Sequence, residues 1–324
     1  MQFARHFRDL GVSVVIHPTI GIAFDERWGV IPDDVKALTC FNPEPHDLEL
    51  IVSAPTFKAT HPNTVYFTMH ESTQLNLNQV DNLSLARSLV VPSSWNLHHF
   101  KTQLPRQLID RVPLGIDPLV YYPRPLPEGP LVFGAAGRYT SAGKRKNPRL
   151  IFDAFSQAFP DDPDVRLRFK CYPDCVIPRS TDSRVEIIRS HFSDAEFVQF
   201  LTSLHVLVAP TSGEGWGLVI QQAAALGRPA IVSSEGGHRQ YLTDQGMFEL
   251  AGNYSVFDSN YYHGSMFKPC RLSLVMLLKY VRNNPASIKL RGASASRCAA
   301  LFPLQQTNDK LTEVLKSRGG LIVP

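Results

Sequence analysis

Residues 210–232 read PTSGEGWGLVIQQAAALGRPAIV. A proline, small residues, an acid at Glu214 and three glycines lead into an apolar, alanine-rich helix, which ends at Gly227 before a β-branched run. Glycines let backbone N–H groups turn toward a ligand, so a turn of this composition is typical of a binding loop. The stretch therefore predicts a strand, a ligand-binding turn and a helix in succession, with Glu214 and the amide Gln222 as the polar side chains of the site.

Short apolar runs alternate with amphipathic, helix-like segments on both sides of this stretch. Such alternation, with helices of about 10 to 15 residues between strands, predicts parallel sheets covered by helices on both faces. Two blocks of this kind occur, so we expect an α/β protein of two doubly wound, Rossmann-like domains facing a cleft. The expected strands are 12–18, 48–54, 63–70, 88–93 and 111–116 in the first block, and 131–137, 165–172, 184–190, 205–211 and 228–234 in the second.

The order of these blocks predicts the domain boundaries. We expect an amino-terminal, acceptor-side domain over 1–120, a proline-rich linker over 121–130 and a ligand-binding domain over 131–290. Proline suits the linker because it extends neither a helix nor a central strand. We expect residues 291–324 to form a helical tail, and packing of this tail on the first domain is left open.

Composition limits the class of protein. Of the 324 residues, 44% are hydrophobic and 19% charged, as in an ordinary globular protein. No apolar run reaches the ~20 residues of a membrane span, and charged residues interrupt the start MQFARHFRDLG, so we expect no membrane segment and no signal peptide. Five scattered cysteines fit a reducing compartment, which predicts a cytoplasmic protein, either free or peripheral to a membrane. The net charge of +4 suits phosphate-bearing ligands.

The segment FGAAGRYTSAGKRKNP, residues 133–148, is the second candidate binding turn. Its glycines allow close backbone approach, Arg138 offers a planar fork of donors, and Lys144 or Lys146 offers a mobile ammonium. Together with the start of the following helix, these groups predict a cradle for a diphosphate. The alternative is a basic turn that is only solvated.

Glu214 and Gln222 have two interpretations each. A carboxylate accepts hydrogen bonds from sugar hydroxyls, so Glu214 is a candidate contact for a polyhydroxyl ligand. Gln222 lies eight positions later, two helical turns away, and can face the same ligand. The alternative is that Glu214 only caps the helix, where the helix dipole favours an acid, and that Gln222 is an ordinary helix residue.

Five segments together resemble glycosyltransferase family 4, whose members have the GT-B fold. SGEGWGLVIQQAAALGRPAIVSSEGGHRQYL is similar to its nucleotide-sugar loop, and GRYTSAGKRKNPRLIFDAF to its Gly-Arg…Lys-Asn segment. RSLVVPSSWNLHHF and RVPLGIDPLVYYP resemble segments ahead of the interdomain crossing, and VYFTMHES resembles a strand end whose histidine faces the donor sugar. The resemblance covers roughly residues 1–315, and its carboxyl-terminal motifs are specific in combination.

The resemblance implies an enzyme that transfers a sugar, with retention, from a nucleotide-diphosphate sugar to a saccharide, a lipid-linked saccharide or another hydroxyl compound. It implies His70 and Glu214 as catalytic residues. The alternative for His70 is a strand-end histidine whose hydrogen bonds are satisfied within the protein. Diphosphate and donor contacts are implied for Arg138, Lys144, Lys146, Gly215, Trp216, Gly217, Leu218 and Gln222. The donor is a substrate, so no cofactor is expected. Because neither candidate turn carries a pair of acids, we also expect no metal.

The chain departs from the family pattern at two places. Gln222 stands where the family has a second glutamate that holds the ribose, and the chain starts at the helix that follows the family's first strand. We therefore expect an amino-terminal domain without its first strand, either because the recorded start lies downstream of the true one or because the domain is reduced. Two alternatives stay open: a degenerate nucleotide-sugar-binding protein without transfer, and a nucleic-acid-modifying glycosyltransferase, for which no basic run gives support.

Overall fold

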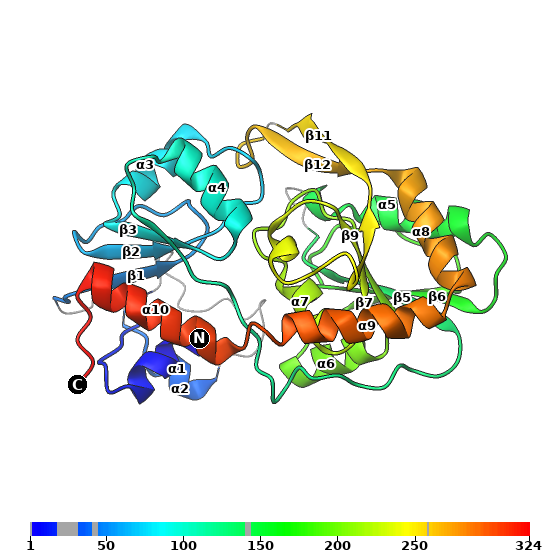
Figure 1. Ribbon diagram of the computed structural model, residues 1–324, viewed down its shortest axis with the longest axis horizontal. Coiled ribbons are helices and arrows are strands. Elements are labelled where there is room, and N and C mark those ends of the chain that lie inside the picture. The colour runs from blue at the N-terminus through cyan, green and yellow to red at the C-terminus, as the bar shows by residue number, and fades with distance from the viewer. Residues whose placement is uncertain (1, 18–31, 41–44, 140–143, 258) are drawn as a thin grey trace. The chain divides into compact units, whose positions relative to one another are not determined.

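The computed structural model describes residues 2–17, 32–40, 45–139, 144–257 and 259–324. The chain forms two compact units (Figure 1). The first unit comprises Met1–His70, Leu75–Pro113 and Gln305–Pro324, and the second comprises Glu71–Gln74 and Leu114–Leu304. The division therefore falls at Pro113, ahead of the expected linker 121–130, and the expected tail is shared between the two units.

The first unit contains a parallel sheet of four strands in sequential order. They are β1 (Glu49–Val52), β2 (Thr64–Phe67), β3 (Ser88–Val91) and β4 (Ile109–Arg111). Helices α3 (Leu77–Ser84) and α4 (Ser94–Gln103) lie on one side of this sheet, and α1 (Gln2–Asp9), α2 (Asp33–Lys36) and α10 (Leu304–Gly319) on the other (Figure 1). Capping by the side chain of Ser93 explains where α4 begins, since it accepts the backbone N–H of Asn96.

The prediction of a buried strand over 12–18 is wrong for its described residues, 12–17. Only Ile16 makes a bridge, to Thr39, and none of these residues is buried. An apolar run becomes a strand only where a neighbour pairs with its backbone along its length, and a single bridge does not supply that. The strand expected over 111–116 is also displaced, because β4 ends at Arg111.

The second unit contains a parallel sheet of six strands in the order β10-β9-β8-β5-β6-β7. Its strands are β5 (Leu131–Gly137), β6 (Val165–Cys171), β7 (Val185–Arg189), β8 (Val206–Ala209), β9 (Ala230–Ser233) and β10 (Met247–Leu250). The first five match expected strands, whereas β10 was not predicted. Two halves with parallel sheets, one in each unit, make the α/β, Rossmann-like architecture that the alternating pattern predicted.

Helices cover both faces of the six-stranded sheet. One core contains α5 (Pro148–Ala158) and α8 (Arg271–Asn283), and the other contains α6 (Asp194–Thr202), α7 (Leu218–Ala225) and α9 (Ala286–Ala299). Strand β8 shows the alternation, because Val206 and Val208 belong to the first core and Leu207 to the second. Both faces of this central strand are therefore apolar, as expected where helices cover both sides of a parallel sheet.

A hairpin that the sequence did not reveal follows β10. Strands β11 (Gly252–Val256) and β12 (Ser265–Pro269) pair antiparallel in a separate two-stranded sheet. Two short 3₁₀ helices, η2 (Lys144–Lys146) and η3 (Gly237–Gln240), complete the loops of this unit. No helix among the described residues is both long and apolar enough to cross a bilayer.

The strand order locates the binding edge of the second unit. The chain runs outward from β5 to β7, then returns to the other side of β5 with β8 and continues to β10. Ligands of open parallel sheets bind at the carboxyl ends of the strands where the order reverses. That point lies between β5 and β8, so residues 144–147 and 210–217 are brought together there.

Candidate active site

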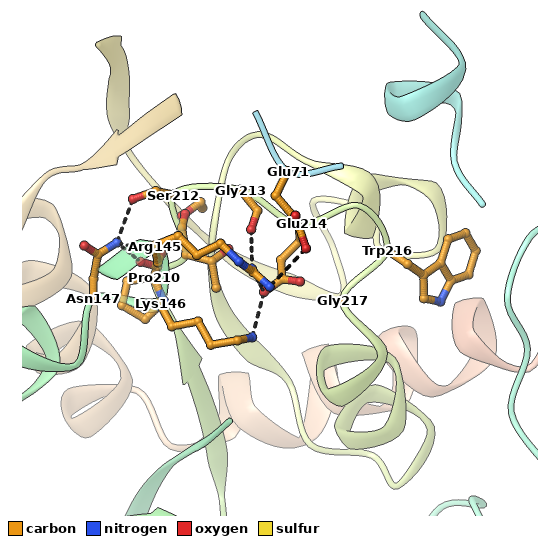
Figure 2. Close-up of polar contacts among 12 residues, drawn as sticks. Glu71, Arg145, Lys146, Asn147, Pro210, Ser212, Gly213, Glu214, Trp216 and Gly217 are labelled. Atoms are coloured by element: carbon orange, nitrogen blue, oxygen red, sulfur yellow. Dashed lines mark hydrogen bonds and ion pairs between the residues drawn. The ribbon is translucent and has the colours of Figure 1, made fainter. Parts of the chain in front are cut away.

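Asn147 joins the two turns at this edge. It adopts the left-handed backbone conformation (φ 48°), which asparagine tolerates better than most residues. Its side-chain amide donates to the carbonyls of Arg145 (3.1 Å) and Pro210 (2.8 Å) and to Ser212 Oγ (2.9 Å). One side chain therefore fastens the turn after β5 to the turn after β8 (Figure 2).

Glycines let backbone segments approach closely in the turn after β8. A Cβ on Gly213 would lie 1.9 Å from the carbonyl oxygen of Glu71, and a Cβ on Gly237 would lie 1.9 Å from that of Gly215. Gly217 precedes α7 with φ 84°, a conformation that side chains disfavour. Larger residues would force these segments apart, so the glycines are required by close approach as well as by the turn itself.

Glu214 is the centre of the charged cluster. The residue is 7% exposed, and its carboxylate accepts from Arg145 Nη1 (2.9 Å) and Lys146 Nζ (3.0 Å). Burial alone would raise the pKa of Glu214, but the two cations outweigh it and lower the pKa to about 2. The helix-cap interpretation is wrong, because α7 has Gly217 at its N-cap and no side-chain cap. Glu214 is a permanently charged acceptor at neutral pH.

Arg145 is a central site residue that sequence reasoning missed. Its guanidinium donates to the Gly213 carbonyl (2.7 Å) and to Glu214, and its Nη2 lies 3.2 Å from Glu71 Oε1 (Figure 2). Only 14% of the side chain is exposed, and burial, which lowers its pKa, is outweighed by the two carboxylates. The run Lys-Arg-Lys at 144–146 was a usable signal, but a sequence does not say which of three successive cations points inward.

Glu71 brings a second carboxylate to the cluster. Burial and the neighbouring charge of Glu214 raise the pKa of Glu71, whereas Arg145, Lys146 and a hydrogen bond with Tyr262 lower it, and the net shift is upward. Tyr262 lies between β11 and β12, and burial raises its pKa to about 12. The hairpin therefore contributes a phenol to a site otherwise made by the two strand-end turns.

The structure brings Lys146 and Glu214 together, whereas it pairs Arg138 with Asp174. Arg138 Nη2 donates to Asp174 Oδ2 at 2.9 Å, and a quarter of its side chain is exposed. Lys144 opens η2, and its side chain lies outside the described part of the structure. The described ionic contacts with Glu214 come from Arg145 and Lys146.

Trp216, expected to contact substrate, has its indole in the core. The ring is 1% exposed, its Nε1 donates to Gln221 (2.7 Å), and it packs on Tyr241 and Phe302. Figure 2 shows the indole directed away from Arg145 and Glu214. The polar groups that Trp216 can offer a ligand at this edge are therefore those of its backbone.

Leu218 and Gln222 lie along α7. Leu218 is the first residue of the helix and is 43% exposed. The Gln222 amide is half-buried and donates to the hydroxyl of Tyr121 at 2.8 Å. Burial raises the pKa of Tyr121 to about 12, so its phenol stays protonated. The Gln222 amide oxygen, opposite this donated bond, is the group that can accept from a ligand hydroxyl.

His70 belongs to the first unit and ends the expected strand segment after β2. It is 1% exposed, and its carbonyl accepts from Asn96 Nδ2 at 2.7 Å. Asn96 is itself fully buried on α4, so the segment after β2 is held by a helix of the same unit.

His238 is a buried histidine that the sequence did not single out. Its Nε2 lies 2.7 Å from the carbonyl of Ser233. Burial lowers the pKa of His238 more than the nearby charge of Glu214 raises it. A neutral imidazole therefore supports the loop after β9 from inside, next to Gly236, which precedes η3.

Acidic residues at the site engage protein cations. No group of three or more histidine, cysteine or acidic residues within the described ranges is arranged to hold a metal ion. One Asp-x-Asp does occur, Asp162-Pro163-Asp164, but it precedes β6 and so lies at the opposite edge of the sheet. Asp162 there accepts from Arg282 at 2.7 Å. Metal independence stays a prediction.

Comparison with known proteins shows which protein family and which solved structures this chain resembles. Residues 130–255 match the family model described as glycosyl transferases group 1, and no curated protein matches the chain. Among solved structures, a glycosyltransferase from Rickettsia africae has a TM-score of 0.68 at 13% identity, over 98% of this chain and 93% of that one. Sucrose-phosphate synthase from Thermosynechococcus elongatus has a TM-score of 0.61 at 16% identity, over 79% and 67%.

A third solved structure, HepE from Anabaena in complex with UDP and glucose, has a TM-score of 0.61 at 15% identity, over 78% of this chain and 71% of that one. These likenesses establish the fold as GT-B. The match over 130–255 covers the binding edge described above, so this part of the chain is similar to the glycosyl transferases group 1, and the protein is a glycosyltransferase.

Proposed function

We propose that the protein is a retaining glycosyltransferase of family 4, which transfers a sugar from a nucleotide-diphosphate sugar to a hydroxyl acceptor without a metal. The observation that carries this proposal is the contact of Glu214 with Arg145 and Lys146 at the point where the strand order reverses. Two cations suited to a diphosphate, Arg145 and Lys146, thereby lie beside a carboxylate suited to sugar hydroxyls, that of Glu214.

The chemistry follows from where charge develops. As the bond between the anomeric carbon and the diphosphate breaks, negative charge gathers on the leaving oxygen, and a new bond forms to the acceptor oxygen. Arg145, Lys146 and the backbone N–H groups around Gly215 and Gly217 would stabilise that charge more in the transition state than in the ground state. The leaving diphosphate takes up the proton of the acceptor hydroxyl. Because the acceptor attacks the same face of the sugar that the diphosphate leaves, the anomeric configuration is preserved.

A uridine diphosphate sugar is the first donor to test. HepE, whose fold this chain shares, is described in complexes with UDP, with UDP and glucose, and with UDP-glucose. Glu214 is proposed to contact the sugar and Gln222 the ribose, while Arg138, Lys144 and Lys146 approach the diphosphate and His70 orients the sugar. The acceptor is proposed as a saccharide, a lipid-linked saccharide or another hydroxyl compound, and the protein as cytoplasmic or peripheral to a membrane.

The test is a screen of nucleotide-diphosphate sugars with the purified chain, following both thermal stabilisation and release of free nucleotide. Stabilisation together with nucleotide release, increased by a saccharide acceptor, is the result expected of a transferase. Stabilisation with no release, even by hydrolysis, would replace this proposal by a degenerate nucleotide-sugar-binding protein. Binding of none of the donors would remove it.

A further inference from the structure

The backbone of Glu71 is held firmly next to the donor site, although Glu71 lies 74 positions before Arg145 in the sequence. Its carbonyl oxygen is so close to Gly213 that no side chain fits there. Two residues on, the Thr73 N–H donates to the Ser265 carbonyl (3.0 Å), and Thr73 Oγ1 accepts from the Ser265 N–H (2.8 Å). The turn after β8 and the hairpin strand β12 therefore hold Glu71 from two sides.

Among the described residues, the charges around Glu71 balance. The described titratable and charged groups that act on Glu71 are Arg145, Glu214, Lys146 and Tyr262. With Tyr262 neutral, two cations match two carboxylates. A donor diphosphate adds two negative charges to this poorly solvated cluster, and an excess of buried negative charge is costly unless a proton enters.

We propose that Glu71 is a positioning residue that holds Arg145 while the site is empty and takes up one proton when the donor diphosphate binds. This inference rests on the proposed function, because it requires a nucleotide-diphosphate donor at Arg145 and Lys146.

Geometry makes Glu71 the group that changes. Glu214 accepts from both cations, at 2.9 and 3.0 Å, whereas Glu71 contacts only Arg145 among them, at 3.2 Å. Arg145 cannot follow a ligand far, since the Gly213 carbonyl and Glu214 hold its Nη1. The loosest ionic contact of the cluster is thus the one between Arg145 and Glu71. Burial and Glu214 already favour the protonated form of Glu71, and a diphosphate acts in the same direction.

The experiment is isothermal titration calorimetry of the full chain with UDP-glucose and, in parallel, with other nucleotide-diphosphate sugars. Each titration is repeated in buffers of different ionisation enthalpy, so that the slope of the observed enthalpy gives the protons taken up. The diphosphate of such a donor is a diester without the monoester oxygen that titrates at about pH 6. Proton uptake measured between about pH 6.5 and 8.5 therefore belongs to the protein.

The wild type is expected to take up close to one proton, with affinity falling by up to about tenfold for each pH unit of increase, since binding is linked to protonation. Glu71→Gln is expected to bind without uptake and to lose this pH dependence. Glu186→Gln, which removes a carboxylate from an exposed pair with Arg168 on β6, is the matched control and should behave as the wild type.

The outcomes separate the two proposals. Binding by the wild type with no net proton exchange overturns the role of Glu71 and leaves the proposed function standing, and this measurement needs no variant to fold. Uptake that persists unchanged in Glu71→Gln overturns it as well. Binding of no donor by the wild type overturns the proposed function, and the role of Glu71 with it.

Discussion

Two buried arginines of the second unit are held in opposite ways. Arg228, three residues after α7, is fully buried. Its hydrogen bonds within the described ranges all go to backbone carbonyls, those of Leu204, Arg124, Leu226, Pro125 and Thr202. Arg145, at the carboxyl edge of the sheet, donates to one carbonyl and faces two carboxylates.

The electrostatic consequences differ accordingly. Burial lowers the pKa of Arg228 to about 10, with no carboxylate to compensate, whereas Glu214 and Glu71 outweigh burial at Arg145 and raise its pKa. Neutral carbonyls that are fixed in the backbone cannot be exchanged for a ligand, so Arg228 serves the fold. Carboxylates on side chains can yield to phosphate oxygens, which suits Arg145 to binding. The comparison teaches that the partners of a buried cation, more than its burial, indicate its role.

The largest effect is expected for Arg228→Met. Removing the guanidinium leaves several buried carbonyls without a donor, at about 1–3 kcal/mol for each, so the free energy of unfolding should fall by more than ~3 kcal/mol. Denaturant unfolding measures this loss, and donor affinity of the folded fraction should stay unchanged. Reduced affinity with intact stability would mean that Arg228 is not a purely structural residue.

The next largest effect is expected for Arg145→Ala and Lys146→Ala on nucleotide binding. Each removes a cation that is proposed to contact the diphosphate, and a charge-assisted hydrogen bond is worth about 1.5–3 kcal/mol. Nucleotide affinity measured by calorimetry should fall in both, while Arg149→Ala, which breaks only an exposed pair with Asp153, should bind as the wild type. If neither variant at the site loses affinity, the diphosphate does not bind between these cations.

Acid unfolding should show a contribution from Glu214. Its pKa falls from an ordinary 4.5 to about 2 in the folded protein, so its ionisation stabilises the fold above about pH 4.5, and this contribution is lost as the pH falls toward 2. Thermal unfolding in this window should depend less on pH in Glu214→Gln than in the wild type. An unchanged slope would show that Glu214 is not held by the cations in solution.

A smaller effect is expected at Gln222. Gln222→Ala removes the hydrogen bond to Tyr121, worth about 0.5–1.5 kcal/mol of stability, and should weaken donor binding by loss of an acceptor for the ribose. Gln222→Glu should preserve or modestly tighten donor binding, since a carboxylate is the stronger acceptor. The test measures the affinities of both variants for the donor and for the free nucleotide. If Gln222→Ala binds as tightly as the wild type, Gln222 does not contact the ligand and is an ordinary helix residue.

The smallest effect is expected from removing divalent metal. If Arg145 and Lys146 balance the diphosphate charge, turnover in excess chelator should equal turnover without it. A matched assay with added magnesium or manganese serves as the control. Loss of turnover in chelator, restored by either ion, would contradict metal independence.

Local patterns in the sequence determined most of the framework of the second unit. The apolar run 131–137 forms β5 with those ends, and Ser193 and Glu196 form the capping box that starts α6. These features depend on neighbours within a few positions, which a sequence displays directly. The turn around Glu214 was also readable, because several glycines next to a strand end are a local signal of a turn, as at Gly217 with φ 84°. The close approach of Gly213 to Glu71 was not readable in this way.

Tertiary structure alone decided which side chains enter the site. The inward cation of Lys-Arg-Lys is fixed by Glu214 and Glu71, which lie 69 and 74 positions from Arg145. The indole of Trp216 went to the core because Gln221, Tyr241 and Phe302 receive it there. Residues 12–17 stayed outside a sheet since only one of them found a pairing partner. Burial and charge pairing depend on which distant segments the fold brings together, and no local pattern records that.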